Sequence, residues 1–240
     1  MRRVLITGAS SGLGRALAER LAGDGATVLA TARREARLLE LAKAHPTIEP
    51  HALDVTDAGA VAAFCAEVGP LDAAVLNAAV NHIGPFDEAD MAVDEALIST
   101  NVTANLRLAR ALKPALAGGR LVLVGSMGGF IPLPQQAVYS GTKAFIHNWG
   151  LALREEWRGD VSVGVFAPGG IKTEMTDVAA LSHVERHLAP AGDVAAELAR
   201  FTASDRALSV PGAGNRAAAR LLRLVSPATR ARLAARVYKS

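Results

Sequence analysis

The feature that most constrains the fold is a glycine-rich turn close to the start of the chain. Residues 4–7 form a short apolar run, and the turn that follows, residues 7–14 (TGASSGLG), leads directly into a helical pattern. Such a turn brings free backbone N–H groups and the positive end of a helix dipole together, which favours binding of a pyrophosphate. The glycines permit the tight turn and the close approach of a ligand. The spacing is G-x-x-x-G-x-G rather than G-x-G-x-x-G, so a purely structural turn stays open as an alternative.

Short apolar runs alternate with amphipathic segments along most of the chain. The strand candidates are residues 4–7, 26–31, 48–53, 71–76, 120–125, 161–166 and 207–210. Several of them are continuously apolar, which is typical of parallel strands that are covered on both faces. Segments with helical spacing of apolar residues lie between them, at 12–23, 35–44, 58–68 and 139–157. We therefore predict an α/β fold, a single Rossmann-type domain around a doubly wound, mostly parallel seven-stranded sheet.

Local signals refine this prediction. Asp57 and Asp193 stand where N-caps of helices are expected. No linker, repeat or low-complexity stretch interrupts the chain before about residue 205, so one domain fits better than two. Ligands of a doubly wound sheet bind at the carboxyl ends of its strands, and we expect the functional residues there.

Composition excludes several classes of protein. Half of the 240 residues are apolar, which is enough for a sizeable core and excludes intrinsic disorder. No apolar run reaches the roughly 18–20 residues of a transmembrane helix, and residues 4–6 are too short for a signal peptide, so we expect a cytoplasmic protein. A single cysteine, Cys65, excludes a disulfide within the chain, and we expect it to be a small buried hydrophobe.

The charge is distributed unevenly. Residues 206–240 contain eight basic residues and no acidic one, whereas the other 205 residues hold 18 basic and 23 acidic residues, a net charge of −5. A basic tail and ten aromatic residues are weak evidence for nucleic acid, and we expect no such partner. Residues 217–225 and 229–237 carry Leu or Val and Arg at helical spacing. A basic amphipathic helix can bind an anionic membrane surface, but we favour packing on the body or on a neighbouring subunit.

The residues after the second predicted strand indicate which dinucleotide the turn would bind. This strand ends at Thr31 and is followed by Ala32, Arg33 and Arg34. A site for NAD carries Asp or Glu at this place for the ribose 2′-hydroxyl, and a carboxylate would repel a 2′-phosphate. A guanidinium can bind that phosphate with two hydrogen bonds. The pattern favours NADP(H), with two solvated arginines beside Glu35 as the alternative.

Tyr139 and Lys143 are four residues apart and therefore lie on one face of a predicted helix. A tyrosine has a pKa of about 10 and is a poor proton shuttle near neutrality. An ammonium one turn away favours the phenolate and lowers that pKa towards a useful range. Ser126 closes the fifth predicted strand, and its hydroxyl can hydrogen-bond a substrate oxygen at the same place. An ordinary amphipathic helix with an exposed lysine is the alternative for Tyr139 and Lys143 alone.

Taken together with Asn77-Ala78-Ala79, Ser126 and Tyr139-Ser140-Gly141-Thr142-Lys143, the opening turn resembles the short-chain dehydrogenase/reductase family over residues 3–210. The resemblance implies that Tyr139 is the general acid in carbonyl reduction and the base in alcohol oxidation. It implies that Lys143 lowers the pKa of the tyrosine and holds the nicotinamide ribose, and that Ser126 orients the carbonyl. Asn101 would complete a water-linked proton relay, with Asn105 as the nearby competitor for that role.

The same resemblance implies a set of residues that bind NADP(H). They are Gly8, Ser10, Ser11, Gly12, Leu13, Gly14, Arg33, Arg34, Asp54, Val55, Asn77, Ala78, Ala79, Tyr139, Lys143, Pro168, Gly169, Ile171 and Thr173. Asp54 and Val55 would contact the adenine, and the segment from Pro168 to Thr173 would meet the nicotinamide carboxamide. Val80 is a small departure, because the form of the Asn77 motif that ends in glycine is commoner in the family.

Apolar segments flank the expected catalytic residues. Residues 130–134 (FIPLP) follow Ser126, and Met175 and residues 178–181 follow Thr173. Such a lining suits a hydrophobic ketone, aldehyde or secondary alcohol. We expect residues 1–210 to form the NADP-binding oxidoreductase domain, with a substrate lid at about 172–192, and residues 211–240 to form a basic helical extension.

The other histidines predict no metal site. His183 and His187 read His-Val-Glu-Arg-His, in which the glutamate is one place later than in the zinc-protease pattern. We therefore expect surface or pocket-lining histidines here, and a packing or interface residue at His147.

The reaction predicted from these residues and from the resemblance is transfer of a hydride between NADP(H) and a small-molecule carbonyl or alcohol. A cofactor-sensing or membrane-recruited interaction protein on the same fold is the second hypothesis, with the basic tail as its support. An epimerase or dehydratase is a third, but such relatives carry a substrate domain that 240 residues do not provide. A homodimer or homotetramer, formed through the helices that contain Asn101 and Tyr139, is implied by the resemblance.

Overall fold

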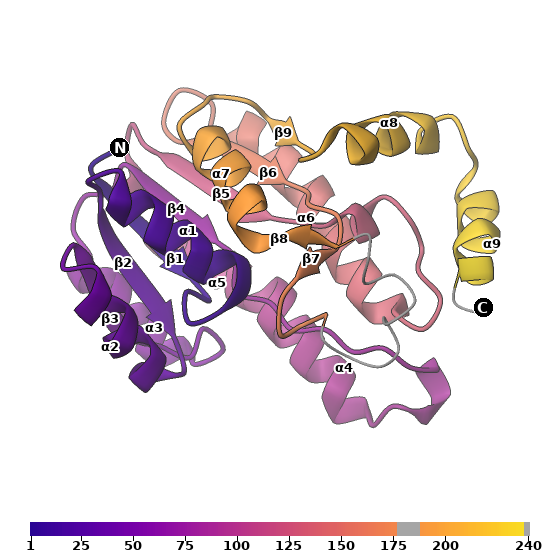
Figure 1. Cartoon of the computed structure of the whole chain (residues 1–240), viewed down its shortest axis with the longest axis horizontal. Helices are drawn as coiled ribbons and strands as arrows, with labels where there is room; N and C mark the ends of the chain where they lie inside the picture. The colour runs from indigo at the N-terminus through magenta and orange to yellow at the C-terminus, as the bar shows by residue number, and fades with distance from the viewer. Residues whose placement is uncertain (177–187, 238–240) are drawn as a thin grey trace.

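The apolar runs of the sequence form one parallel sheet in the computed structural model, which describes residues 1–176 and 188–237 (Figure 1). Its seven strands are β1 (Arg3–Thr7), β2 (Thr27–Ala32), β3 (Ile48–Ala52), β4 (Ala73–Leu76), β5 (Arg120–Val124), β6 (Ser162–Phe166) and β9 (Leu208–Ser209). Their order is β3-β2-β1-β4-β5-β6-β9, and each neighbouring pair is parallel. The predicted single-domain, doubly wound Rossmann sheet is confirmed.

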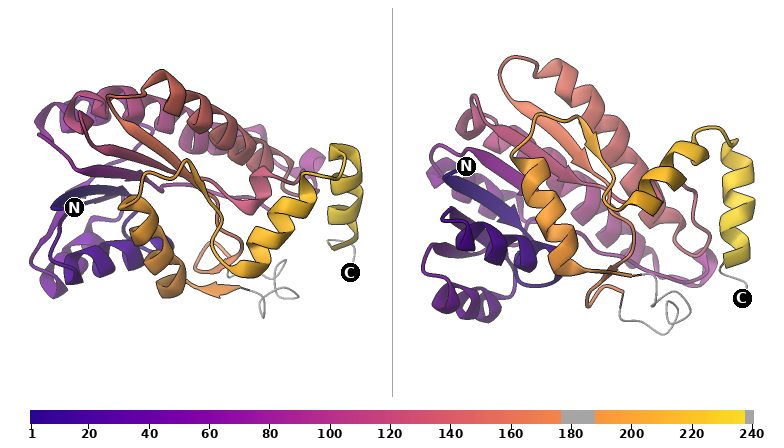
Figure 2. Two further views of the ribbon diagram at one scale, coloured as in Figure 1. Left: turned by 90° about the horizontal axis from the view of Figure 1, so that it is seen from above. Right: turned by 45° about the horizontal axis from the view of Figure 1, so that its top comes forward.

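Helices cover both faces of the sheet (Figure 2). One face carries α1 (Gly12–Gly23), α2 (Glu35–Ala44) and α7 (Ala191–Thr202), and the other carries α3 (Ala58–Glu67), α5 (Ala104–Leu112) and α6 (Ala137–Glu156). Successive strand residues supply the two layers alternately, because side chains of a strand point to opposite faces. In β1, for example, Val4 and Ile6 join the first layer while Leu5 joins the second.

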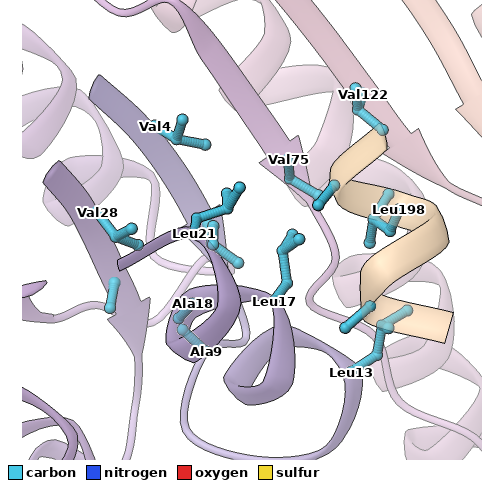
Figure 3. Packing of buried hydrophobic residues seen from close by; sticks show 14 of the residues in the cluster. Val4, Ala9, Leu13, Leu17, Ala18, Leu21, Val28, Val75, Val122 and Leu198 are labelled. Carbon is cyan, nitrogen blue, oxygen red and sulfur yellow. The ribbon is translucent and has the colours of Figure 1, made fainter. Parts of the chain in front are cut away.

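The first layer holds α1, and with it the glycine-rich turn, against the sheet. Leu13, Leu17 and Leu21 of α1 point towards valines of the central strands, and Leu198 of α7 packs beside them (Figure 3). Leu17 is completely buried. Burial of a leucine side chain contributes roughly 1.5–3 kcal/mol, so this apolar stripe fixes where the helix N-terminus lies at the edge of the sheet.

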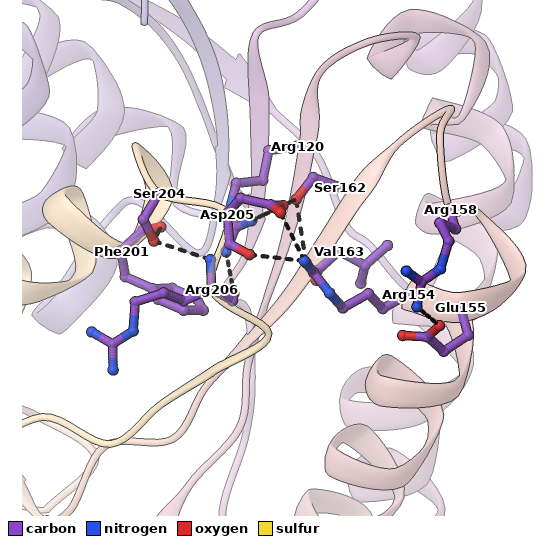
Figure 4. A network of polar contacts seen from close by, with 10 residues as sticks. All are labelled: Arg120, Arg154, Glu155, Arg158, Ser162, Val163, Phe201, Ser204, Asp205 and Arg206. Atoms are coloured by element: carbon purple, nitrogen blue, oxygen red, sulfur yellow. Dashed lines mark hydrogen bonds and ion pairs between the residues drawn. The ribbon is translucent and has the colours of Figure 1, made fainter.

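A polar network fixes the far side of the sheet, where β9 joins it (Figure 4). Arg120, at the start of β5, is almost completely buried and donates hydrogen bonds to Ser162 Oγ (2.6 Å) and to the backbone oxygen of Arg206 (2.7 Å). Asp205 forms ion pairs with Arg120 at 3.5 Å and with Arg154 at 2.9 Å. Burial lowers the pKa of Arg120 to about 10, so the guanidinium keeps its charge at neutral pH.

Other elements connect this framework to the pocket. The helix α4 (Met91–Ile98) continues through a π-helical turn, Ser99–Thr103, into α5. The strands β7 (Ile171–Lys172) and β8 (Ala189–Pro190) form a small parallel sheet that the sequence analysis did not predict. Two helices follow β9, α8 (Ala213–Leu222) and α9 (Pro227–Val237), and extend away from the sheet (Figure 1).

Two local predictions need correction and one is confirmed. Asp57 caps α3, since its side chain accepts a hydrogen bond from the Ala60 N–H at 3.0 Å. Asp193 is not an N-cap: β8 leads directly into α7, Pro190 precedes the helix, and Asp193 lies within its first turn. Cys65 is half-buried rather than buried, and packs at the edge of the second layer, where burial raises the pKa of its thiol to about 11.

Among residues 1–176 and 188–237, no helix combines the length and the apolar character that crossing a bilayer requires.

Candidate active site

A pocket of about 610 Å³ opens at the carboxyl ends of the central strands. It extends from Arg33 and Arg34, after β2, past the glycine-rich turn to Ser126 and Tyr139. Nineteen residues that were expected at the cofactor or in catalysis line this pocket. They are Gly8, Ser10, Ser11, Gly12, Leu13, Arg33, Arg34, Asp54, Val55, Asn77, Ala78, Ala79, Ser126, Tyr139, Lys143, Pro168 and Gly169, together with Ile171 and Thr173 from the same segment.

The glycine-rich turn requires its glycines for two different reasons. Gly8 and Gly12 have φ angles of +69° and +55°, a backbone conformation that favours glycine. Gly14 does not line the pocket; a Cβ there would lie 2.6 Å from Asn77 Nδ2 and would collide with the backbone oxygen of Gly8. It is therefore a packing position behind the turn.

Thr7 and Asn77 join the turn to the end of β4. The Thr7 hydroxyl accepts hydrogen bonds from the backbone N–H groups of Asn77 and Ala78, each at 3.0 Å. The Asn77 side chain donates to the backbone oxygens of Thr7 at 3.0 Å and of Gly8 at 3.4 Å. These contacts hold the floor of the pocket where the order of strands reverses between β1 and β4.

The two arginines after β2 stand at one end of the pocket. Arg34 donates hydrogen bonds to Ser10 Oγ (3.2 Å) and Ser11 Oγ (2.6 Å) of the turn. It also forms an ion pair with Glu174 at 2.8 Å, and Arg37 of α2 contacts the same carboxylate. Hydrogen bonds from Arg34 and Arg37 lower the pKa of Glu174. The positive charge at this end is therefore shared with a carboxylate that the sequence analysis did not single out.

Asp54 lies between β3 and α3, close to that end of the pocket. Its carboxylate accepts hydrogen bonds from the side chain (2.7 Å) and the backbone N–H (2.9 Å) of Thr56. These bonds, followed by the charge of Arg33, lower the pKa of Asp54. The aspartate is thus a fixed, ionised group in the pocket wall.

Tyr139 and Lys143 lie on the face of α6 that lines the pocket. Lys143 is 4% exposed; its Nζ donates a hydrogen bond to the Val124 backbone oxygen at 3.1 Å and lies 5.7 Å from the centre of the Tyr139 ring. Burial lowers the pKa of Lys143 to about 8. The alternative of an exposed lysine on an ordinary amphipathic helix is excluded.

Ser126 follows β5 and caps a short 3₁₀ turn, Met127–Gly129. Its Oγ accepts a hydrogen bond from the Gly128 N–H at 3.0 Å. Its own backbone N–H donates to His147 Nε2 at 3.4 Å. His147 is buried, and its ring lies 4.4 Å from that of Phe130.

Asn101 lies in the π-helical turn behind the pocket wall rather than in it. Its Oδ1 accepts a hydrogen bond from the Val80 N–H, and its Nδ2 donates one to the Val80 backbone oxygen, both at 2.9 Å. Nδ2 also donates to Thr142 Oγ1 at 3.2 Å. Asn105 donates to the backbone oxygen of Asn101 at 2.9 Å. Of these two residues, Asn101 is the one that supports the pocket wall, because Val80 lines the pocket directly.

The segment after β6 closes the opposite wall. The methyl group of Thr173 lies 3.1 Å from the position of a Cβ on Gly12, so this segment packs directly on the glycine-rich turn. Gly169 faces Asn215 of α8, whose Nδ2 would lie 2.6 Å from a Cβ there. Asn215 lines the pocket, although nothing in its local sequence indicated a role.

Apolar side chains line the pocket near Ser126 and Tyr139. Ile131, Leu133 and Met175, which were expected, line the pocket, and so do Met127 and Leu188. Phe130 packs on His147 and does not line the pocket. Residues 178–181 and the histidines at 183 and 187 fall outside the described residues. In the described ranges, no cluster of three metal-ligating side chains is present.

Comparisons with known proteins find relatives of the chain. A family model described as short chain dehydrogenase matches residues 2–182. An uncharacterized oxidoreductase of Myxococcus xanthus is 40% identical over 187 residues, 73% of this chain and 74% of that protein. Sulfoacetaldehyde reductase 2 of Chromohalobacter salexigens is 36% identical over 223 residues, 84% of this chain and 88% of that protein. A solved short chain dehydrogenase from Burkholderia cenocepacia J2315 in complex with NADP matches with a TM-score of 0.83 and 26% identity, covering 95% of this chain and 100% of the other.

The buried Lys143 leads to a prediction about stability. We expect Lys143→Met to raise the free energy of unfolding of the cofactor-free protein by about 1–3 kcal/mol at pH 7. The pKa of Lys143 is about 8 in the folded chain, against 10.5 for a solvated lysine. Because the folded-state pKa is the lower one, the buried charge of Lys143 destabilises the wild type fully below pH 8. This destabilisation, and with it the gain from Lys143→Met, disappears as the pH rises towards 10.5.

Urea unfolding at pH 7 and at pH 10 measures this effect. Lys43→Met, at an exposed position of α2, is the matched control and is expected to change the free energy of unfolding little at either pH. The prediction is contradicted if Lys143→Met does not raise the free energy of unfolding at pH 7, or if the increase at pH 10 is as large as at pH 7.

Proposed function

Since the chain belongs to the short-chain dehydrogenase family of oxidoreductases, we propose that it is an NADP(H)-dependent enzyme that interconverts an apolar ketone or aldehyde and the corresponding alcohol. The observation that carries the proposal is the position of Tyr139 and the buried Lys143 in the same pocket as the glycine-rich turn. When bound, the cofactor supplies or accepts a hydride at the carbonyl carbon.

The pocket fits a dinucleotide along its length. In this proposal residues 8–13 hold the pyrophosphate, because the positive φ angles of Gly8 and Gly12 form the tight turn and α1 begins within it, at Gly12. Asp54 and Val55 contact the adenine, and residues 77–79 with Lys143 contact the nicotinamide ribose. Residues 168–173 meet the carboxamide, with Gly14 as support behind the turn. The Burkholderia neighbour, which contains NADP, is consistent with this assignment.

The proton chemistry follows from the contacts of three side chains. Tyr139 gives its proton to the carbonyl oxygen during reduction and takes it back during oxidation. The Lys143 ammonium stabilises the phenolate that results, because its charge is buried and little screened. Ser126 Oγ already accepts the N–H of Gly128, so its own O–H is oriented to donate to the substrate oxygen. Asn101, which binds the backbone of Val80 in the pocket wall, completes a water-linked proton relay in this proposal.

The substrate end of the pocket supports an apolar substrate. Of the described residues that line the pocket, the Lys and Arg residues are Lys143 and the two arginines at the far end. Among the described lining residues, the side chains beside Met127, Ile131 and Leu133 therefore include no guanidinium. The proposed apolar substrate differs from the sulfonated aldehyde to which the name of the Chromohalobacter relative refers.

We also propose a homo-oligomer formed through α4, α5 and α6. Large apolar side chains are exposed on two of these helices, among them Met91, Ile98 and Leu151. Phe145 and Trp149 stack on each other at the edge of the same layer. Exposed apolar groups on neighbouring helices are typical of a subunit contact.

Replacement of the tyrosine tests the reaction. We expect Tyr139→Phe to lower kcat by roughly 10²-fold or more, because general acid catalysis is lost, while the Kd for NADPH changes little. Oxidation of NADPH is followed at 340 nm with a panel of apolar and polar carbonyls, and binding is followed by fluorescence titration. Turnover that survives in the variant, or a clear preference of the wild type for polyols, contradicts the proposal.

Replacement of Arg34 tests the choice of cofactor. We expect Arg34→Gln to lower kcat/KM for NADPH by roughly tenfold or more and to leave that for NADH nearly unchanged, since a charged hydrogen bond to the 2′-phosphate is removed. Arg37→Gln is the matched control, because Arg37 contacts Glu174 but does not line the pocket. Equal losses of kcat/KM with the two cofactors would show that Arg34 does not bind the 2′-phosphate. Arg33→Gln is measured in the same assay to compare the two arginines.

A second candidate role concerns the basic tail. On α8 and the residues just after it, Leu221 and Leu224 are 64% and 85% exposed, beside Arg220 and Arg223, while Ala219 packs on the body. Apolar and cationic side chains on one exposed helix, with no acidic residue after Asp205, fit an anionic lipid surface. The same helix carries Asn215 into the pocket, so a lipid contact would lie beside the substrate end.

If the tail binds an anionic lipid surface, the wild type sediments with phosphatidylglycerol vesicles and not with phosphatidylcholine vesicles, and Leu221→Asp with Leu224→Asp weakens this binding by about tenfold or more. Leu39→Asp, at an exposed leucine of α2, is the control. Unchanged sedimentation removes the lipid hypothesis, and so does a double variant that instead dissociates the oligomer in analytical ultracentrifugation.

A further inference from the structure

A buried imidazole lies directly behind Ser126 and has no part in the proton chemistry proposed above. His147 is 7% exposed, and its Nε2 accepts the backbone N–H of Ser126 at 3.4 Å. Its Nδ1 is buried and has no hydrogen-bond partner among the described residues. A buried nitrogen without a partner costs stability, so packing alone is a poor account of a histidine at this place.

The turn that carries Ser126 is built around this ring. A Cβ on Gly125 would collide with Nε2 and would lie 2.6 Å from Cδ2 of His147. A Cβ on Gly129 would lie 2.6 Å from Cε1 and 2.8 Å from Nδ1. The ring of Phe130 contacts His147 with the ring centres 4.4 Å apart. The imidazole thus touches the backbone on both sides of Ser126 and occupies the space that the two glycines leave.

The ring is a constant hydrogen-bond acceptor at neutral pH. Burial, and then the charge of Lys143, lower the pKa of His147 to about 4. A neutral imidazole has one N–H group, and because Nε2 accepts from Ser126 the proton must be on Nδ1. The contact therefore depends on one tautomer.

We propose that His147 is a positioning residue for Ser126: its Nε2 fixes the serine backbone, and its ring fixes the turn, so that the serine hydroxyl is directed into the pocket. The Gly128 N–H completes this arrangement by binding Ser126 Oγ at 3.0 Å. The catalytic role of the Ser126 hydroxyl rests on the proposed function. The contact between Ser126 and His147 is present in the cofactor-free protein and can be tested without any substrate.

Nuclear magnetic resonance of the cofactor-free protein tests the contact. We expect long-range ¹H–¹⁵N correlations to show His147 as the neutral Nδ1–H tautomer at pH 7, and the Ser126 amide to exchange slowly with deuterium. The Ser126 amide is expected to lose this protection in His147→Asn and to keep it in His147→Gln. The glutamine Oε1 reaches the position of Nε2, but the asparagine Oδ1 does not. An Nε2–H tautomer, or equal protection in the two variants, overturns the proposal.

The same pair of variants tests the consequence for turnover. We expect His147→Asn to lower kcat by about tenfold or more, with the KM for NADPH changed by less than about twofold, because only the serine is displaced. His147→Gln is expected to retain kcat within about threefold of the wild type. His147→Leu also lacks a hydrogen-bond acceptor and is expected to lower kcat as His147→Asn does. It replaces His147→Asn in the comparison if that variant folds poorly. Equal activity of His147→Gln and His147→Asn at unchanged melting temperatures contradicts the role.

These outcomes separate the two proposals. If the wild type reduces no carbonyl with NADPH while the tautomer and amide protection are as expected, the proposed function fails and the Ser126–His147 contact stands. If the wild type is active and the amide protection does not depend on His147, the positioning role fails and the proposed function stands.

Discussion

The hydrogen bonds between Thr7 and the backbone of Asn77 and Ala78 are the contacts on which the pocket most depends. They join the carboxyl ends of β1 and β4, the two strands between which the order of the sheet reverses. A crevice forms at such a point because the helices that follow the two strands leave on opposite faces. The Asn77 side chain adds its own bonds to the turn and thereby fixes the N-terminus of α1 relative to the rest of the pocket.

The other end of the pocket depends on Lys143, a buried charged group that lowers the stability of the fold. Lys143 is buried on α6, where its Nζ donates a hydrogen bond to the Val124 backbone oxygen, and burial lowers its pKa. A buried ammonium without a carboxylate partner destabilises a fold. The surrounding packing of α6 on β5 and β6 supplies the compensation. Stability and reactivity are therefore opposed at this one side chain, as is common in active sites.

The sequence predicted the sheet and most of the pocket because both follow from local patterns. Continuous apolar runs identify buried parallel strands, and residues that follow such strands, like Ser126 and Arg34, meet at one edge by topology. Asn215 and Glu174 were missed because they reach the pocket from far along the chain, through α8 and the segment after β7. Asp193 was misplaced for a related reason, since the helix start is set by β8, a strand too short to show in the sequence.

The glycines show most clearly where local reasoning ends. At Gly8 and Gly12 the backbone itself needs a positive φ, and a tight turn after a strand indicates as much from sequence. At Gly14, Gly125 and Gly129 the need is for space, because Gly8 and Asn77 approach the first, and His147 approaches the other two. In the sequence the two kinds of glycine are identical. Only the residue that packs against each glycine distinguishes the two kinds. For Gly125 and Gly129 that residue is His147, about twenty residues further along the chain, and its local sequence predicted no more than a packing or interface role.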